Sequence, residues 1–439
     1  MNIKTRLFQA SILLLNEIME AVYFLLKLLP VREGKILFCS RQSKKVPLDF
    51  ILLKAEINAK SPSSKIVIIC SHIDQDVRSK VIFFAQMLES MYHLATSEVC
   101  IIDSYWPAVS MLHHKKNLKI IQLWHSLGKT KKSGYQTLGK KSGRRREFAK
   151  YLKMHKNYDY LIGGAPVWNK YYCEAFNIAE DKILNYGLPR IDYLVKTEKQ
   201  NREKFFESFP QWKGKKIVLY APTFRRNMKS EWNKIGEAQK YEDIVIVIKN
   251  HPGQSAGSIS AHENIAFIDD WETIDLLAAC DYMITDYSSI ALEAAVLRKK
   301  TFYWTYDYDE YMKNSGINID LRKELSDNVF EDIDQLLEHI RNDKYNSNLQ
   351  QRYINKYLPS ELGNSTERIT SLILSLITEQ QVEIYETGDN GRWQREQMEK
   401  SFGNYQTLGG DKWRTADLKD NKAVGYDGSG EFGDNSNVS

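Results

Sequence analysis

Short apolar runs alternate with longer mixed segments along most of the chain, and this alternation predicts the fold. After Pro30 the first runs are KILFCS, KIVIIC, EVCIID, LKIIQLW, YDYLIGG and KILNYG. A second series reads KIVLYAP, IVIVIKN, IAFID, DYMITD and KTFYW. Runs rich in Val, Ile and Tyr that are separated by helix-length segments are typical of parallel strands joined by crossovers. Two such series predict an α/β protein with two doubly wound, Rossmann-like domains.

The stretch before Pro30 has a helical pattern instead. Residues Leu7 to Leu29 are rich in leucine, and at about 100° per residue the polar positions fall on one narrow stripe. These positions are Gln9, Asn16, Glu20 and Lys27. Glutamates are costly in the middle of a bilayer, and no small-residue cleavage pattern follows, so we expect neither a spanning helix nor a removed signal peptide. We expect an amphipathic helix that lies on a membrane surface or packs on the protein itself.

A chain of 439 residues is too long for one compact core, so we divide it into parts. The parts are 1–30, the amphipathic helix; 31–195, the first Rossmann-like domain; 196–214, a charged linker; 215–378, the second Rossmann-like domain; and 379–439, a polar tail that we expect to be flexible. The cysteines, at positions 39, 70, 100, 173 and 280, are odd in number and lack metal-type spacing. They predict reduced thiols rather than disulfides or a zinc site.

The net charge is only +5, but basic residues gather in one segment, 129–156. That segment holds eleven Lys or Arg residues against one acid, whereas a solvated helix face normally mixes signs. An anionic membrane, a polyphosphate substrate or nucleic acid would suit it. The residues that we expect to meet such a partner are Lys129, Lys131, Lys132, Arg144, Arg145 and Arg146. The lack of interleaved aromatic residues and of a nucleic-acid module counts against nucleic acid.

A histidine follows a predicted strand in each domain. His125 comes directly after KIIQLW, and His251 follows IVIVIKN. Open α/β sheets bind ligands at the carboxyl ends of their strands, and histidine exchanges protons near neutral pH. The two histidines can therefore form an acid/base pair across a cleft. Each could instead be a structural, hydrogen-bonded histidine.

Other strand ends carry groups suited to anions. Lys249 and Asn250 stand beside His251 and Pro252, and Arg225 follows LYAPTF. Ser288 and Ser289 precede the helix-like IALEAAVL, where Thr285 ends the strand and Asp286 supplies a capping oxygen. The N–H groups at a helix start attract anions, and arginine matches phosphate through forked hydrogen bonds. Helix capping alone would also explain the serines.

The motifs that the sequence lacks exclude several classes of enzyme. GQSAG at 253–257 matches the nucleophile pattern of hydrolases, but NHP separates it from the strand, so we do not expect a hydrolase. The chain has no G-x-x-x-x-G-K-[ST], no G-x-G-x-x-G and no paired carboxylates suited to magnesium. We therefore expect no metal ion and no other cofactor.

Four segments together resemble the CDP-glycerol glycerophosphotransferase family, the teichoic-acid primases and polymerases of bacterial cell envelopes. They are QLWHSLGKTKK, LYAPTFRR, IKNHP and CDYMITDYSSIALEAAVLRKKTFYWTYDYDEY, in that order. The resemblance implies a GT-B-like fold, with 31–195 as acceptor domain and 215–378 as CDP-donor domain. It also implies peripheral attachment to the cytoplasmic face of the membrane. The implied reaction moves an alditol phosphate from a CDP-activated donor to an anionic lipid-linked or polymeric acceptor and releases CMP.

The resemblance also implies roles for single residues. His125 would be the base on the acceptor hydroxyl, and His251 and Arg225 would lie by the donor phosphates. Asp286, Ser288 and Ser289 would cradle the donor, with Glu293 standing where the family often has Asp. The chain departs from the usual family wording at residues 126–130, which leaves CDP-ribitol as a possible donor in place of CDP-glycerol. Two further functions stay open: a GT-B glycosyltransferase that uses a nucleotide sugar, and a non-catalytic basic protein that binds membrane or nucleic acid.

Overall fold

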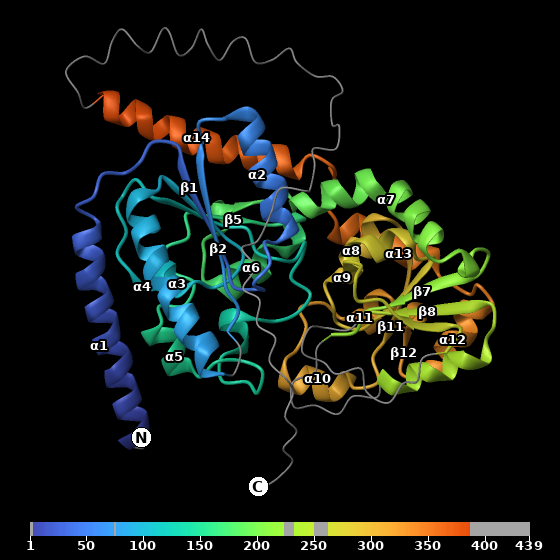
Figure 1. Cartoon of the computed structure of the whole chain (residues 1–439). Coiled ribbons are helices and arrows are strands. Elements are labelled where there is room, and N and C mark those ends of the chain that lie inside the picture. Colours follow the sequence, from blue (N-terminus) through green and yellow to red (C-terminus); the bar gives the residue numbers. More distant parts are fainter. Residues whose placement is uncertain (1–2, 74–75, 224–231, 250–261, 387–439) are drawn as a thin grey trace, which may run out of the picture. The chain divides into compact units, whose positions relative to one another are not determined.

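The computed structural model describes residues 3–73, 76–223, 232–249 and 262–386 (Figure 1). Everything reported below about the sheets and the candidate site lies within residues 1–381, which form one compact unit. The described parts of this unit contain two parallel sheets of six strands each, so the predicted α/β fold with two doubly wound domains is confirmed.

The first sheet has the strand order β2-β1-β3-β4-β5-β6, and every neighbouring pair is parallel. Its strands are β1 (Lys35–Ser40), β2 (Lys65–Cys70), β3 (Val99–Ile102), β4 (Lys119–Gln122), β5 (Tyr160–Ile162) and β6 (Ile183–Leu184). The connecting helices are α2 (Leu48–Lys60), α3 (Val77–Thr96), α4 (Pro107–Met111), α5 (Arg146–Tyr151) and α6 (Asn169–Phe176). The order reverses between β1 and β3, and in such sheets ligands bind at the carboxyl ends beside the reversal.

The second sheet has the order β12-β11-β10-β7-β8-β9 and is also parallel throughout. Its strands are β7 (Lys216–Tyr220), β8 (Ile244–Ile248), β9 (Ile265–Phe267), β10 (Tyr282–Thr285), β11 (Lys300–Trp304) and β12 (Val329–Phe330). Its helices are α8 (Thr273–Ala279), α9 (Ile290–Val296), α10 (Tyr308–Asn314), α11 (Leu321–Glu324) and α12 (Ile333–Arg341). Short 3₁₀ turns lie between the elements of both sheets: η1 (Gly134–Thr137), η2 (Pro166–Trp168), η3 (Glu180–Lys182), η4 (Pro210–Trp212), η5 (Trp232–Lys240) and η6 (Ser326–Asn328). In the second sheet the reversal lies between β7 and β10.

Helices link the two sheets. The segment predicted as linker, 196–214, belongs in large part to α7 (Pro189–Ser208), which packs on both α2 and α8. Side chains of α13 (Ser347–Tyr357) and α14 (Ser365–Glu386) join the same core as the first sheet, although the sequence division placed these helices with the second domain. Asp192 of α7 fixes the start of α14, because its carboxylate accepts from the backbone N–H of Ser365 and of Thr366 at 3.1 and 2.7 Å. The domain boundaries themselves stay predictions.

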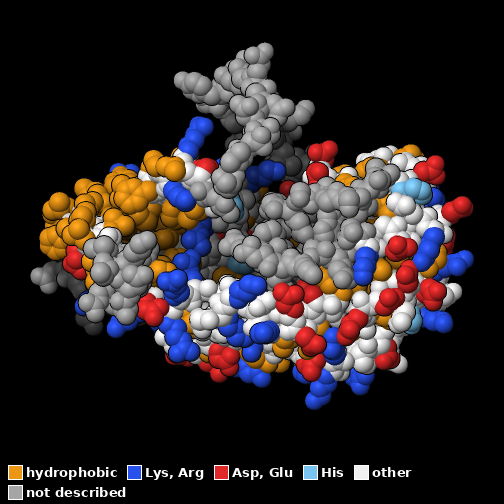
Figure 2. Space-filling model, turned by 90° about the horizontal axis from the view of Figure 1, so that it is seen from below, with side chains coloured by type: hydrophobic (Ala, Val, Ile, Leu, Met, Phe, Trp, Pro, Cys, Tyr) orange, Lys and Arg blue, Asp and Glu red, His pale blue; other side chains and the backbone are white. Residues whose placement is uncertain are grey.

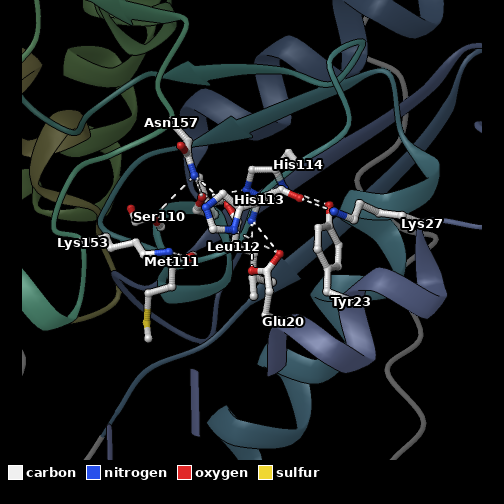
Figure 3. A network of polar contacts seen from close by, with 11 residues as sticks. Glu20, Tyr23, Lys27, Ser110, Met111, Leu112, His113, His114, Lys153 and Asn157 are labelled. Atoms are coloured by element: carbon white, nitrogen blue, oxygen red, sulfur yellow. Dashed lines mark hydrogen bonds and ion pairs between the residues drawn. The ribbon is translucent and has the colours of Figure 1, made fainter. Parts of the chain in front are cut away.

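Helix α1 (Ile3–Leu26) turns its polar stripe toward the protein. Figure 3 shows Glu20 and Lys27 pointing at His113: the His113 backbone N–H donates to Glu20 at 3.1 Å, and Lys27 Nζ donates to the His113 carbonyl at 2.8 Å. The Tyr23 hydroxyl donates to Nδ1 of His114 at 2.8 Å, since Nε2 of that ring is used on the Val109 carbonyl. The remaining stripe residues, Gln9 and Asn16, are buried. The helix therefore packs on the protein through its polar side.

The opposite face of α1 is apolar and exposed. Its exposed side chains are Leu13, Leu14, Leu15, Ile18, Val22, Phe24 and Leu25. Helix α3, which packs against α1, adds Val77, Val81, Ile82, Phe84 and Leu88. Figure 2 shows apolar side chains gathered on the α1 side of the molecule, in orange at the left. Among the described helices, α1 is also the one that is long and apolar enough, from Gln9 to Leu26, to cross a membrane by length and composition.

Candidate active site

A cavity of about 580 Å³ opens at the carboxyl ends of the strands and receives side chains from the surroundings of both sheets. Contributors from the first domain and α7 include Ser43, Lys45, Pro47, His125 and Arg190. Contributors from the second domain include Pro222, Lys249, Ser288, Ser289 and Glu293. Five residues predicted from the sequence as site residues therefore line one cavity: His125, Lys249, Ser288, Ser289 and Glu293. Arg225, Asn250, His251 and Pro252 lie outside the described residues.

His125 reaches the cavity because the chain leaves the sheet just before it. Leu123 still pairs with β3, its N–H donating to the Ile102 carbonyl at 2.7 Å. Trp124 then adopts a left-handed backbone conformation with φ of 61°, which a bulky residue takes only when its surroundings hold it there. The Trp124 ring lies against the His125 ring with 3.9 Å between centroids. This turn, which no sequence pattern revealed, aims the imidazole.

Nδ1 of His125 has two polar neighbours. It lies 3.0 Å from the carbonyl oxygen of Asp103, which accepts, and 2.9 Å from the side-chain amide nitrogen of Gln42, which donates. In the tautomer that donates to the Asp103 carbonyl, Nδ1 carries the proton and Nε2 is left to accept one. Burial, together with the charges of Lys129, Arg190 and Lys131, lowers the pKa of His125 to about 4 against the effect of the Asp103 carbonyl. The ring is therefore neutral near pH 7, and Nε2 can accept a proton.

Lys129 differs from the exposed cation that the sequence suggested. Only 3% of the residue is exposed. Its Nζ lies 4.4 Å from the ring centroid of Trp124 and 5.0 Å from that of Phe176, and it hydrogen-bonds to Ser133. Burial lowers the pKa of Lys129 to about 7. In this conformation Lys129 packs against Trp124 in the turn that precedes His125, and its expected contact with an acceptor or a membrane stays a prediction.

The rest of the basic segment divides into two groups. Lys131 and Lys132 are half-buried, and the backbone around them pairs with the second domain. Lys132 N–H donates to the Gly316 carbonyl at 3.1 Å, and the Asn318 side chain donates to the Lys129 carbonyl at 2.7 Å. Arg144, Arg145 and Arg146 are exposed, as expected. Their contact with a membrane or an acceptor stays a prediction.

Asp286 and Thr285 do not line the cavity, and their expected role in binding the donor stays a prediction. Asp286 is 3% exposed, and its carboxylate accepts from the Thr223 N–H at 3.0 Å, the Thr223 hydroxyl at 2.5 Å and the Tyr287 N–H at 2.6 Å. Thr285 is fully buried and donates its hydroxyl to the Ala221 carbonyl at 2.8 Å. Both side chains fasten the end of β10 to the end of β7. They position the turn that contributes Pro222 to the cavity.

Other predicted residues of the second domain do face the cavity. Ser289 precedes α9, but its side chain makes no capping hydrogen bond, so capping does not explain it. Lys249 follows β8 and donates its ammonium to the Asp269 carbonyl at 2.8 Å. Glu293, one turn into α9, forms an ion pair with Arg190 at 3.6 Å. These side chains bring hydroxyl, cationic and acidic groups to one wall of the cavity.

Sequence reasoning missed Arg190 and its partner Asp49. Arg190 lies several residues past the end of β6 and already inside α7, so the rule that pointed to His125, a polar residue just past a strand, does not find it. Asp49 carried no strand-end signal either, because it lies inside a helix. In the described parts of the chain, no group of three or more His, Cys, Asp or Glu side chains could hold a metal ion. The expectation that no cofactor is needed stays a prediction.

Comparison with known proteins gives consistent matches. The family model for CDP-glycerol:poly(glycerophosphate) glycerophosphotransferases matches residues 21–375. A teichoic acid ribitol-phosphate primase of Bacillus spizizenii is 27% identical over 80% of this chain and 93% of its own length. A teichoic acid glycerol-phosphate primase of Bacillus subtilis is 28% identical over 66% of this chain and 77% of its own. The solved wall teichoic acid polymerase TagF has a TM-score of 0.66 at 20% identity, with 86% of this chain and 98% of TagF covered, which shows a shared GT-B-like fold.

Proposed function

Because the chain belongs to the CDP-glycerol:poly(glycerophosphate) glycerophosphotransferase family, we propose that it transfers glycerol phosphate from CDP-glycerol to an anionic acceptor. The acceptor is a lipid-linked or polymeric precursor of teichoic acid or a related cell-surface polymer, and CMP is released. The observation that carries this proposal is His125, a neutral histidine that opens onto a cavity shared by both domains. A TagF variant has been soaked with CDPG, which supports the same class of donor.

The proposed step needs one base and several cations. Nε2 of His125 takes the proton of the acceptor hydroxyl while that oxygen attacks the β-phosphorus of the donor. The bond between that phosphorus and the bridging oxygen breaks, and CMP leaves with the electron pair. Such transfers depend on positioning and on neutralising charge at the phosphoryl oxygens. Lys249 and the start of α9 supply charge and donors on the described side, and the parts assigned to His251 and Arg225 stay predictions.

The donor alditol has two candidates. Relatives named for glycerol phosphate and for ribitol phosphate both match this chain. The match covers a larger share of the ribitol-phosphate primase than of the glycerol-phosphate primase. Ser126 to Thr130, where the chain departs from the usual family wording, follows the base directly. Ribitol phosphate is therefore the second candidate for the transferred group.

Release of CMP is the direct test. Purified protein is incubated with a lipid-linked acceptor and CDP-glycerol, CDP-ribitol or a UDP-sugar in turn, and the consumed donor is identified. We expect one CDP-alditol to be consumed, the UDP-sugar to be left intact, and a chelator to have no effect. Consumption of the UDP-sugar alone would replace the proposal by a nucleotide-sugar glycosyltransferase. Consumption of none would end the proposal.

We further propose that the protein works on the cytoplasmic surface of the membrane through the apolar face of α1. The helix docks on the protein by its polar stripe, so the exposed leucines face outward, and interfacial helices bury such a face among lipid headgroups. Exposed Arg144 to Arg146 would add attraction to anionic lipid and to anionic acceptor.

Vesicle flotation tests the attachment. Replacing Leu14, Ile18 and Leu25 by serine removes exposed apolar groups and is expected to move the protein from anionic vesicles to the soluble fraction. Val195→Ser, at an exposed apolar residue on α7, serves as the control. Alkaline carbonate separates peripheral from spanning attachment, because a spanning helix would keep the wild-type protein in the vesicle pellet.

A further inference from the structure

Arg190 opens onto the cavity beside the proposed base. It stands at the start of α7, and its side chain is 24% exposed. It lines the same cavity as His125 and Ser288, and its charge is one of those that act on His125. A guanidinium carries five N–H donors in a fixed planar fork, which matches carboxylate and phosphate oxygens.

One buried carboxylate holds Arg190 in place. Asp49 of α2, which is 2% exposed, accepts from the backbone N–H of Arg190 and from its Nε, both at 2.8 Å. Nη2 bonds to the same carboxylate. Because Asp49 holds both the backbone and one edge of the guanidinium, the orientation of the side chain is fixed. Nη1 is left on the other side of the fork.

The partner of Nη1 is held less tightly. Oε1 of Glu293 lies 3.6 Å from Nη1, which is an ion-pair distance but longer than a hydrogen bond. Burial raises the pKa of Glu293 to about 7, with Arg190 opposing the shift. The Glu293 carboxyl therefore holds only part of its negative charge near pH 7. A stronger anion can replace it at Nη1 without disturbing Asp49.

The charges around the ion pair favour such an exchange. Asp49 already balances the charge of Arg190, and Asp103 acts on it as well, so Glu293 is an additional acid beside one guanidinium. Glu293 lines the cavity as well, on the wall that also carries Ser288 and Ser289. An incoming phosphate therefore meets a preset N–H donor together with an acid that can become neutral.

We propose that Arg190 binds the transferred phosphate of the donor through Nη1, with Asp49 as its positioning residue and Glu293 as the partner that the phosphate displaces. The inference rests on the proposed function, since it takes the donor to be a CDP-alditol. Nothing in the arrangement requires a change of fold: Nη1 exchanges one anionic neighbour for another.

Three variants test this. Arg190→Lys keeps the charge and removes the fork, Glu293→Gln removes the competing charge, and Arg202→Lys is the matched control. Arg202 lies on the same helix and pairs with Asp281, away from the cavity. Dissociation constants for CDP-glycerol, CDP-ribitol and inorganic pyrophosphate are measured by calorimetry, with kcat and thermal unfolding recorded alongside.

We expect Arg190→Lys to weaken the binding of pyrophosphate, and of whichever CDP-alditol the wild type binds, by about tenfold or more. Glu293→Gln should tighten both several-fold, and Arg202→Lys should leave both unchanged. Unaltered binding by Arg190→Lys would overturn the inference, and so would weakening by Glu293→Gln, because the pair would then be a structural link only. The Glu293→Gln result decides the matter even if Arg190→Lys folds poorly. A wild-type protein that binds neither CDP-alditol would refute the proposed function instead.

Discussion

His125 and Asp286 each stand just past the carboxyl end of a parallel strand, β4 in the first sheet and β10 in the second, yet they are used in different ways. One nitrogen of His125 bonds to the backbone of the neighbouring strand end, and the other is left for the cavity. The Asp286 carboxylate is occupied by donors from the Thr223 turn and from Tyr287. A strand-end position therefore makes a residue available to a ligand only when neighbouring strand ends do not use its polar atoms.

The largest effect is expected from His125→Ala. Loss of the base should lower the rate of CMP release by about 10²- to 10⁴-fold, which is the usual contribution of a positioned general base. The thermal unfolding temperature should stay close to that of the wild type, because the ring is half-buried and makes one hydrogen bond to the backbone. His339→Ala on α12, which does not line the cavity, is the control. A turnover within a fewfold of wild type would place His125 with the structural histidines.

Asp286→Asn should mainly lower the stability of the protein, whereas His125→Ala should mainly lower its activity. An amide has one acceptor oxygen and brings N–H groups toward the Thr223 donors, so the change leaves buried groups unsatisfied at a cost of about 2–4 kcal/mol. Chemical denaturation measures this loss, and Asp270→Asn, at an exposed aspartate, is the control. Activity should fall as the turn loosens. If stability is unchanged while donor binding is lost, Asp286 binds the donor directly after all.

The fold was predictable from the chain, but the difference between these two residues was not. Apolar runs such as IVIVI identify buried parallel strands because the signal is local and repeated. The fate of Asp286 depends on Thr223, which stands 63 positions away and meets it only through the pairing of β7 with β10. The burial of Lys129 likewise depends on Phe176, which lies on α6. Spacing along the sequence carries no information about such partners.

Lowering the pH tests whether His125 is held in its neutral form in the folded protein. Because burial lowers the pKa of His125 to about 4 from the ordinary 6.5, the folded protein binds fewer protons on this ring than the unfolded chain between those values. The ring therefore costs stability as the pH falls from 6.5 to 4. His125→Gln removes that cost, so its stability relative to the wild type should rise over this window. Denaturant unfolding at pH 7 and pH 5 measures the difference, and a constant offset would mean that the pKa is not lowered.

The smallest effect is expected from Ser289→Ala. This variant tests whether Ser289 contacts the substrate or caps helix α9. The serine hydroxyl lines the cavity and does not cap α9, so its removal should raise the KM for the CDP-alditol by about two- to tenfold, the worth of one hydrogen bond. The unfolding free energy should not change, whereas loss of a true N-cap would cost about 1 kcal/mol. Ser347→Ala, outside the cavity at the start of α13, is the control. Lower stability with an unchanged KM would mean that Ser289, like Asp286, stabilises the structure around the cavity and does not contact the substrate.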